Sequence, residues 1–119
     1  MARYRLSSPA KADVASILLV SDANYGSEGR IRYRALLTAA LRRIAADPDG
    51  PTSLDRSEVR SGLRSLHVRH CRIDSRERPV GGPVHVIFYQ ALEPGLVEVV
   101  RVLHERMEPS RHVGPRTDE

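Results

Sequence analysis

The chain has 119 residues, of which 40% are hydrophobic and 29% are charged, and its formal net charge is +4. This balance is typical of one soluble globular domain, and the lack of any run of about 18 apolar residues excludes a membrane span. The single cysteine, Cys71, cannot form a disulfide within the chain, and the first residues lack the apolar stretch of a signal peptide. We therefore expect a cytoplasmic protein with one domain over residues 1–113 and a disordered tail over residues 114–119.

Arginine carries nearly all of the positive charge, since Lys11 is the only lysine. Arginine favours planar, bidentate contacts with carboxylates and phosphates, so the surplus suits either an acidic protein partner or nucleic acid. Codon bias in a high-GC genome produces the same skew. The charge alone therefore does not choose between these readings.

The first half of the chain predicts a strand and two helices. Charged and apolar residues alternate over residues 3–7, which favours a short strand. Ser8 followed by Pro9 is typical of a capped helix start, and Gly26 is expected to end this first helix. Helical structure restarts at once and ends at the proline- and glycine-containing residues 47–51, so the short link predicts an antiparallel hairpin. The faces expected to be buried are Ala10, Val14, Ile17, Leu18 and Ser21 in the first helix and Tyr33, Leu37, Ala40, Leu41 and Ile44 in the second.

The second half of the chain predicts three strands. Residues 51–62 are polar and favour a loop with a single turn, and residues 63–73 mix leucine and valine with basic residues, which favours a strand. Residues 74–83 form a charged connection that we expect to be mobile. Residues 84–89 are β-branched and aromatic and give the clearest strand, and a Glu-Pro-Gly turn joins them to a partner strand over residues 96–104.

These elements predict an α+β fold in the order β-α-α-β-β-β. The expected arrangement is an antiparallel sheet with the N-terminal two-helix hairpin on one face, because this buries both apolar sets. The last strand runs into His-Glu-Arg-Met at residues 104–107, so a buried strand delivers basic side chains to the surface. That end is a solvated strand end, a catalytic edge or a contact surface for another macromolecule.

The chain resembles the ParE-type toxins of the RelE/ParE superfamily, which belong to bacterial type II toxin–antitoxin modules. The resemblance spans residues 4–113. The segments that carry it are residues 4–7, 62–66, 85–89 and 100–107, and the last is the most specific because it combines a strand with its His-x-Arg-Met exit. Two departures are the longer basic arm between the second and third strands and Gln90, where the family often has arginine.

The resemblance implies a growth inhibitor that a ParD-like antitoxin holds inactive, the antitoxin having a ribbon-helix-helix half and a disordered half. ParE-like toxins are associated with inhibition of DNA gyrase, whereas RelE-like relatives are ribosome-dependent mRNA endoribonucleases. Both activities share one fold, so the fold does not choose between them. By alignment Val86 stands where the ribonucleases place a phosphate-holding arginine, and residues 107–119 contain no terminal tyrosine. We therefore expect a non-enzymatic gyrase inhibitor, with no catalytic residue, and keep the endoribonuclease as the alternative.

The resemblance also implies two contact surfaces. The expected target-binding residues, on which toxicity depends, are Arg101, His104, Arg106 and Met107. The expected antitoxin-binding residues are Leu18, Tyr25, Arg30 and Arg34. The alternatives are a solvated strand end for the first set, and a helix packed on two sides with a solvated arginine face for the second.

A metal site and direct nucleic-acid binding are both weak hypotheses. His67, His70 and Cys71 lie close in the sequence, but strand residues of odd separation face opposite sides, so the two histidines would diverge. A nucleic-acid-binding module rests only on the basic balance. We expect no metal, no cofactor and no direct binding of DNA or RNA.

Overall fold

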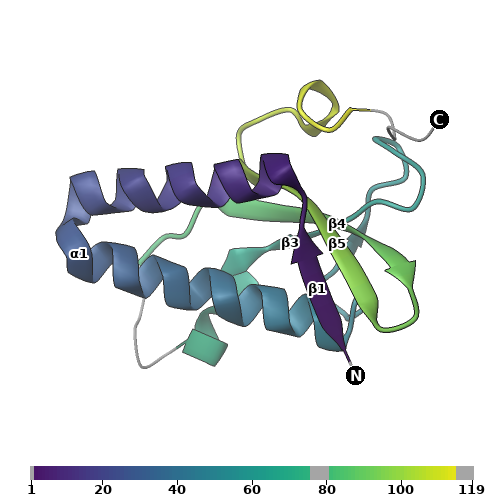
Figure 1. The fold of residues 1–119 in the computed structure, drawn as a ribbon, viewed down its shortest axis with the longest axis horizontal. Helices are drawn as coiled ribbons and strands as arrows, with labels where there is room; N and C mark the ends of the chain where they lie inside the picture. The colour runs from purple at the N-terminus through teal and green to yellow at the C-terminus, as the bar shows by residue number, and fades with distance from the viewer. Residues whose placement is uncertain (1, 76–80, 115–119) are drawn as a thin grey trace.

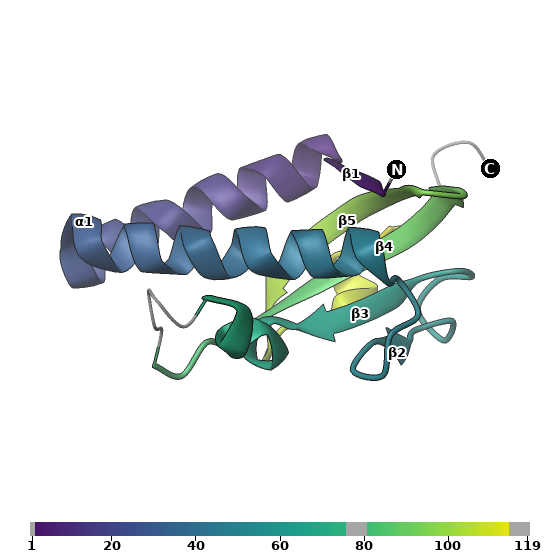
Figure 2. The ribbon, with the colours of Figure 1, turned by 90° about the horizontal axis from the view of Figure 1, so that it is seen from below.

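A computed structural model describes residues 2–75 and 81–114 of the chain. Within these residues the fold is α+β, with a five-stranded sheet and two helical halves that cover one of its faces (Figures 1 and 2), which confirms the predicted class. The elements are β1 (Arg3–Leu6), α1 (Ser8–Ala46), β2 (Leu54–Asp55), β3 (Arg64–His67), the 3-10 helix η1 (Val68–Ser75), β4 (His85–Glu93), β5 (Leu96–His104) and the 3-10 helix η2 (Pro109–Arg111).

The helix α1 is a hairpin, because the backbone leaves the helical conformation at Gly26 with φ 73° and ψ −175°. This combination is open almost only to glycine, so the predicted stop at this residue is confirmed. The predicted cap is one residue too late. The Ser7 hydroxyl, and not that of Ser8, accepts the Ala10 backbone N–H at 3.1 Å, because Ser7 still has extended backbone while Ser8 is already helical.

The core lies between the hairpin and the sheet. The expected face of the second helical half is buried, and so are Leu36 and Ala45 beside it. In the first half Ala10 is buried, while Val14, Ile17 and Leu18 pack partly buried against the same core. A smaller cluster around Phe88 and Val113 lies under the loop at Val59 and the C-terminal segment. Both faces of the sheet therefore exclude water over part of their area.

The sheet has the strand order β1-β5-β4-β3-β2. The antiparallel prediction is correct for β2, β3, β4 and β5 but wrong for β1, which pairs parallel to β5. The parallel pairing of β1 with β5 follows from where the helical hairpin begins. Ser7 donates its backbone N–H to the Val99 carbonyl and its hydroxyl to the Val100 carbonyl, so β1 ends halfway along β5 and the helix starts beside the sheet.

The second strand, which was predicted over residues 63–73, is shorter in the structure. It ends at His67 and the chain continues as η1, in which Val68 and Cys71 are both fully buried. In a 3-10 turn, residues three apart face the same side, so both side chains reach the hairpin, which a strand would not allow. Arg43 holds this turn by donating to the His70 carbonyl at 2.5 Å.

Four other predictions concern a loop, a connection, the C-terminal tail and the last strand. The predicted loop at 51–62 contains the short strand β2, which pairs with β3. Residues 76–80 of the predicted mobile connection and residues 115–119 of the predicted tail lie outside the described residues. The last strand, β5, has the predicted bounds.

Candidate functional site

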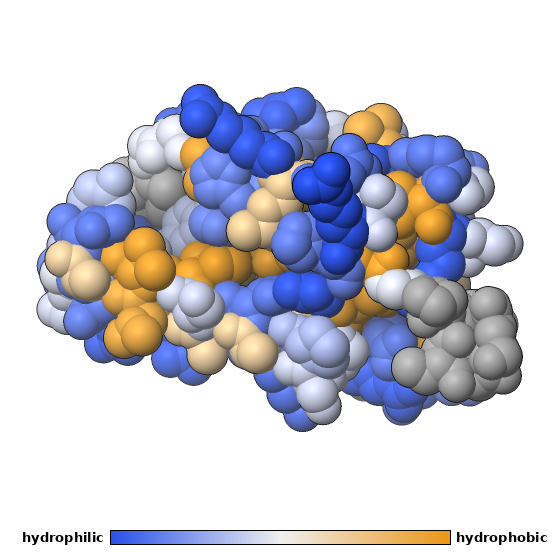
Figure 3. All heavy atoms as spheres, turned by 90° about the horizontal axis from the view of Figure 1, so that it is seen from above, coloured by the Kyte–Doolittle hydropathy of each residue, from blue (hydrophilic) through white to orange (hydrophobic). Residues whose placement is uncertain are grey.

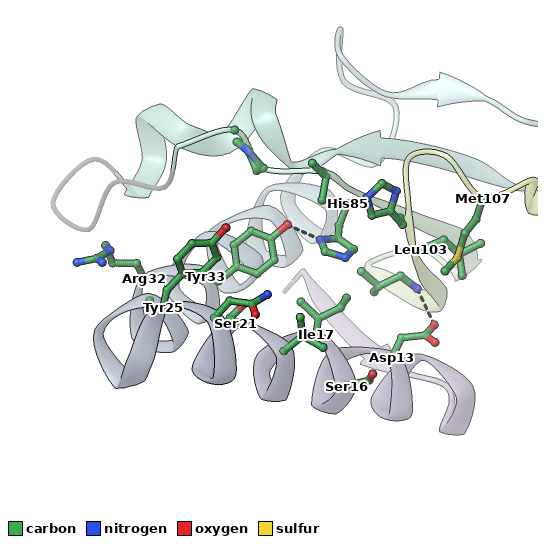
Figure 4. A pocket seen from close by; sticks show the side chains of 18 of the residues that line it. Asp13, Ser16, Ile17, Ser21, Tyr25, Arg32, Tyr33, His85, Leu103 and Met107 are labelled. Carbon is green, nitrogen blue, oxygen red and sulfur yellow. Dashed lines mark hydrogen bonds between the residues drawn. The ribbon is translucent and has the colours of Figure 1, made fainter.

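A pocket of about 680 Å³ lies between the helical hairpin and one end of the sheet (Figure 4). Its walls come from the first helical half, the start of the second half, the start of β4, the end of β5, and residues 107 and 112. A volume of this size falls within the range of ligand sites. Segments far apart in the sequence therefore build one cavity.

Some of the residues that line this pocket are large, apolar and exposed. Tyr25 is 73% exposed, Val20 is 54% exposed and Met107 is 46% exposed. Figure 3 shows apolar surface at the hairpin end of the molecule, extending inward between polar side chains. Exposed apolar side chains that gather around a hollow are typical of a contact site. We call Val20, Tyr25 and Met107 the apolar rim.

An ion pair closes one end of the pocket. The Asp13 carboxylate accepts hydrogen bonds from Nε and Nη2 of Arg101, at 2.7 and 2.9 Å, and from the Val102 backbone N–H at 2.9 Å. Arg101 Nη1 donates to the His112 carbonyl at 2.9 Å. The hydrogen bond to Asp13 raises the pKa of Arg101. Arg101 thus ties the first helical half, β5 and the C-terminal segment together.

Three aromatic rings line the middle of the pocket. The Tyr33 hydroxyl hydrogen bonds Nδ1 of His85, and their ring centroids are 5.4 Å apart. His85 lies directly opposite His104 in the pairing of β4 with β5, and these two rings meet edge to face at 5.8 Å. The pairing of neighbouring strands therefore brings two imidazoles into contact in one cavity.

Burial controls the ionisation of this cluster. It lowers the pKa of His85 to about 4, with repulsion from His104 and His67 acting in the same direction and Glu105 and Asp13 opposing it. Burial likewise raises the pKa of Tyr33 to about 12. At neutral pH both groups are therefore uncharged.

The stability of the protein should fall in mild acid because of His85. In the unfolded chain this histidine takes up a proton near its ordinary pKa of 6.5, whereas in the folded chain it does so only near 4. Between these values the unfolded state binds more protons, so the free energy of unfolding decreases as the pH falls from 6.5 and levels off below 4. Because His85 is only half-buried, we expect a loss of about 2 kcal/mol.

Chemical unfolding at pH 7 and pH 4.5 measures this loss. The variant His85→Gln keeps an acceptor for Tyr33 but cannot titrate, so its stability should depend less on pH than that of the wild type. All other groups titrate in both proteins and cancel in the comparison. An equal pH dependence in the two proteins would contradict the assignment.

A second hollow of about 320 Å³ lies beside the same strand ends. It is lined by Arg56, Val86, Phe88 and residues 104–109. His67, which pairs with Val86 across β3 and β4, contacts Glu105 with 2.7 Å between Nε2 and Oε2. This hydrogen bond lowers the pKa of Glu105. The end of β5 therefore separates two hollows, and His104 lines both of them.

The structure brings together most of the predicted target-binding residues. Arg101, His104 and Met107 line the larger pocket, and Arg106 lines the smaller hollow. Arg106 is exposed, and its backbone N–H donates to Nδ1 of His104 at 3.1 Å. Arg101 differs from the other three because its guanidinium is already paired with Asp13. The role of these residues in target binding stays a prediction.

The predicted antitoxin-binding residues are more scattered. Tyr25 lines the larger pocket, whereas Leu18 packs partly buried against the core. Arg30 lies 3.4 Å from the Asp22 carboxylate across the hairpin turn, and Arg34 is exposed further along the second half. Only Tyr25 among them therefore lies beside the predicted target-binding residues, and their role also stays a prediction.

Several residues that line the pocket were not predicted as site residues, and Asp13, Arg32, Tyr33 and His85 are among them. Tyr33 was expected only as part of the buried face of its helix. A signal existed for His85, since the hairpin turn at 93–95 allows the register of the two strands to be counted back to His104. No such signal exists for Asp13, because the packing of a helix on a strand edge leaves no fixed spacing in the sequence.

Neither a metal site nor a membrane span is found in the described part of the chain. No group of three or more histidine, cysteine, aspartate or glutamate side chains there could hold a metal ion. Cys71 is buried, and burial raises the pKa of its thiol. Over the same residues, no helix has both the length and the apolar character that crossing a membrane requires.

Comparison with known proteins identifies the class of this chain. The family model described as the ParE toxin of type II toxin–antitoxin systems, parDE, matches residues 4–109. Among curated proteins, Toxin ParE1 of Caulobacter vibrioides is 35% identical over 115 residues, covering 96% of this chain and 100% of that protein. Toxin ParE1 of Mycobacterium tuberculosis is 31% identical over 111 residues, covering 93% and 97%. Toxin ParE of Escherichia coli is 33% identical over 110 residues, covering 91% and 89%.

These matches span nearly all of the sheet and the hairpin. The protein is therefore a toxin of the type II toxin–antitoxin class. Within that class, the chain belongs to the ParE toxin family.

Proposed function

We propose that a ParD-like antitoxin neutralises this toxin and that the toxin arrests growth in the cytoplasm by binding DNA gyrase, without catalysing a reaction. The observation that carries the proposal is the apolar rim beside the exit of β5. Aromatic residues and methionine are enriched in protein interfaces, and Tyr25 and Met107 are both exposed here. A protein partner would bury these side chains.

The arrangement of positively charged side chains in the site also favours binding of a protein over cleavage of RNA. An RNA-cleaving site needs a cation that can hold the phosphate in the transition state. Val86, at the position where the ribonuclease relatives carry arginine, lines the smaller hollow beside Phe88 and so offers an apolar surface. Arg101 is ion-paired with Asp13 through two hydrogen bonds. Both features support a binding surface.

An mRNA endoribonuclease of the RelE type is the second candidate. The observation that favours it is the pair of histidines, His85 and His104, whose rings meet at 5.8 Å in the larger pocket. Two imidazoles at this distance are able to act as a general base and a general acid. The two candidates predict different products from the same purified toxin.

Two assays on the purified toxin separate the candidates. We expect inhibition of gyrase supercoiling at stoichiometric concentrations and no cleavage of ribosome-bound mRNA. A His85→Gln variant should inhibit gyrase as the wild type does if the histidine pair has no catalytic role. Cleavage of mRNA with gyrase unaffected would overturn the proposal in favour of the second candidate.

The antitoxin is tested by co-expression with the product of the neighbouring gene. We expect a small acidic protein that co-purifies with the toxin and restores growth. Normal growth when the toxin is expressed alone, in a cell that lacks this neighbour, would contradict the proposal.

A further inference from the structure

The two imidazoles of the larger pocket have their tautomers fixed by their neighbours. His85 Nδ1 is hydrogen bonded to the Tyr33 hydroxyl. Tyr33 keeps its hydrogen at neutral pH because burial raises its pKa to about 12, and we assign that hydrogen to the bond with Nδ1. A neutral imidazole whose Nδ1 accepts must carry its hydrogen on Nε2. His85 therefore presents an Nε2–H donor.

The hydrogen-bond partner of His104 also determines its tautomer. Its Nδ1 accepts the Arg106 backbone N–H at 3.1 Å, which leaves the ring hydrogen on Nε2. Within residues 2–75 and 81–114, neither Nε2 atom has a hydrogen-bond partner. Two neighbouring strands thus place two free N–H donors in one cavity.

The charged groups that line the pocket favour an occupant with negative charge. The carboxylate of Asp13 is already engaged by Arg101 and by the Val102 backbone N–H. Arg32 adds a positive charge to the lining, and its ion pair with Glu28 is long, at 3.8 Å. An occupant that brings an acceptor with negative charge therefore complements this lining.

The remaining walls are apolar. Ile17 on the helix and Val102 on β5 belong to the core on the hairpin side and both line this pocket, and the apolar rim continues this surface to the outside. Figure 4 shows Ile17 and His85 in the same pocket. A small anion would leave that rim exposed. A peptide that carries an acidic residue between apolar residues would cover the rim and also reach the donors.

We propose that the larger pocket binds an acidic side chain of the antitoxin, whose carboxylate accepts from Nε2–H of both His85 and His104 while flanking apolar residues cover the rim. This inference rests on the proposed neutralisation by an antitoxin and names the chemistry by which it is recognised. Because His104 also belongs to the predicted target-binding residues, the antitoxin neutralises the toxin by occupying that surface.

Calorimetric titration of the toxin with the co-purified antitoxin tests the donors. The variants His85→Leu and His104→Leu should each weaken binding about tenfold to a hundredfold, the effect of losing one hydrogen bond to a charged group. His85→Gln should bind nearly as the wild type does, because its amide keeps both an acceptor for Tyr33 and an N–H donor. Thermal melting of each variant shows that it is folded.

His67→Leu is the matched control. His67 lies on the neighbouring strand at the same end of the sheet, but it contacts Glu105 and does not line the larger pocket. Its replacement should leave antitoxin affinity within about threefold of the wild type, since it removes no donor from the pocket. A loss as large as that of His104→Leu would show that binding responds to the sheet end in general, which overturns the proposal.

Substitutions in the antitoxin test the carboxylate without altering the toxin. Each aspartate and glutamate outside its DNA-binding half is replaced by asparagine or glutamine and measured against wild-type toxin and His104→Leu. One position should lose affinity with the wild type and little more with the variant, which is the signature of direct coupling. If no acidic position couples to His104, the proposal is wrong.

Different results separate a failure of the proposed neutralisation from a failure of the proposed histidine contact. If the antitoxin does not bind the wild-type toxin, the proposed neutralisation itself fails. If it binds, but both leucine variants bind equally well, only the histidine contact fails. If acetate or citrate shifts the nitrogen resonances of His85 and His104 while the antitoxin leaves them unchanged, the pocket is a small-anion site and the proposal is overturned.

Discussion

Replacement of Asp13 by alanine should lower the free energy of unfolding by about 3 kcal/mol, the lower part of the range for breaking a partly buried ion pair. The Asp13 side chain is 14% exposed and that of Arg101 is 22% exposed, so little water reaches the pair. The variant leaves Arg101 without its carboxylate and Val102 without a hydrogen-bond acceptor. For a domain of this size the melting temperature should fall by about 10 °C.

The matched control is Asp22→Ala on the same helical half. Asp22 also pairs with an arginine, Arg30, but at 3.4 Å and with both side chains more than 40% exposed. Exposed pairs contribute little, so this variant should lose less than about 1 kcal/mol. Asp13→Asn should fall between the two, because it keeps one acceptor. Equal melting temperatures for Asp13→Ala and Asp22→Ala would show that the Asp13–Arg101 pair does not hold the hairpin to β5.

The double variant His104→Ala, Arg106→Ala should abolish toxicity while leaving the fold intact. Both residues leave a rigid strand at its end, so their side chains are placed in advance for a partner. Loss of an interface arginine can cost about 2 kcal/mol of binding, a factor of roughly thirty. The stability cost is expected to be about 1 kcal/mol, because the hydrogen bond from the Arg106 N–H to His104 is lost.

Growth inhibition and thermal melting must be measured on the same double variant, since an unfolded toxin is also harmless. Arg5→Ala is a suitable control, because Arg5 is exposed on β1 and pairs with the first part of β5, far from its exit. This control should remain toxic. A folded double variant that still arrests growth would show that the exit of β5 is only a solvated strand end.

Much of the fold could be predicted because its signals are local. Glycine at Gly26 ends the first helical half through a backbone conformation that other residues avoid, and the turn at Pro94 and Gly95 fixes the pairing of β4 with β5. The bounds of β5 followed from its apolar run. The 3-10 helix η1 after His67 did not follow, because the mixture of apolar and basic residues there also fits a strand until the hairpin that buries both Val68 and Cys71 is known.

The candidate site was predicted only in part. The exit of β5 was found because His104, Arg106 and Met107 follow a buried strand directly in the sequence. The partners of this exit come from other elements, since Tyr33 lies on the second helical half and His85 begins β4. Tyr33 contacts His85, which lies 52 residues away in the sequence. His85 meets His104 through the pairing of β4 with β5.

The sequence by itself determined the helical hairpin, the strands β4 and β5 and the family, because each depends on neighbouring residues or on short motifs. Only the tertiary structure decided that β1 runs parallel to β5, that Arg101 is engaged by Asp13, and that His85 faces His104 in a pocket. These three features depend on which segments pack together. Packing is set by the burial of whole faces, and residue spacing does not encode which polar groups meet at the edge of a buried face.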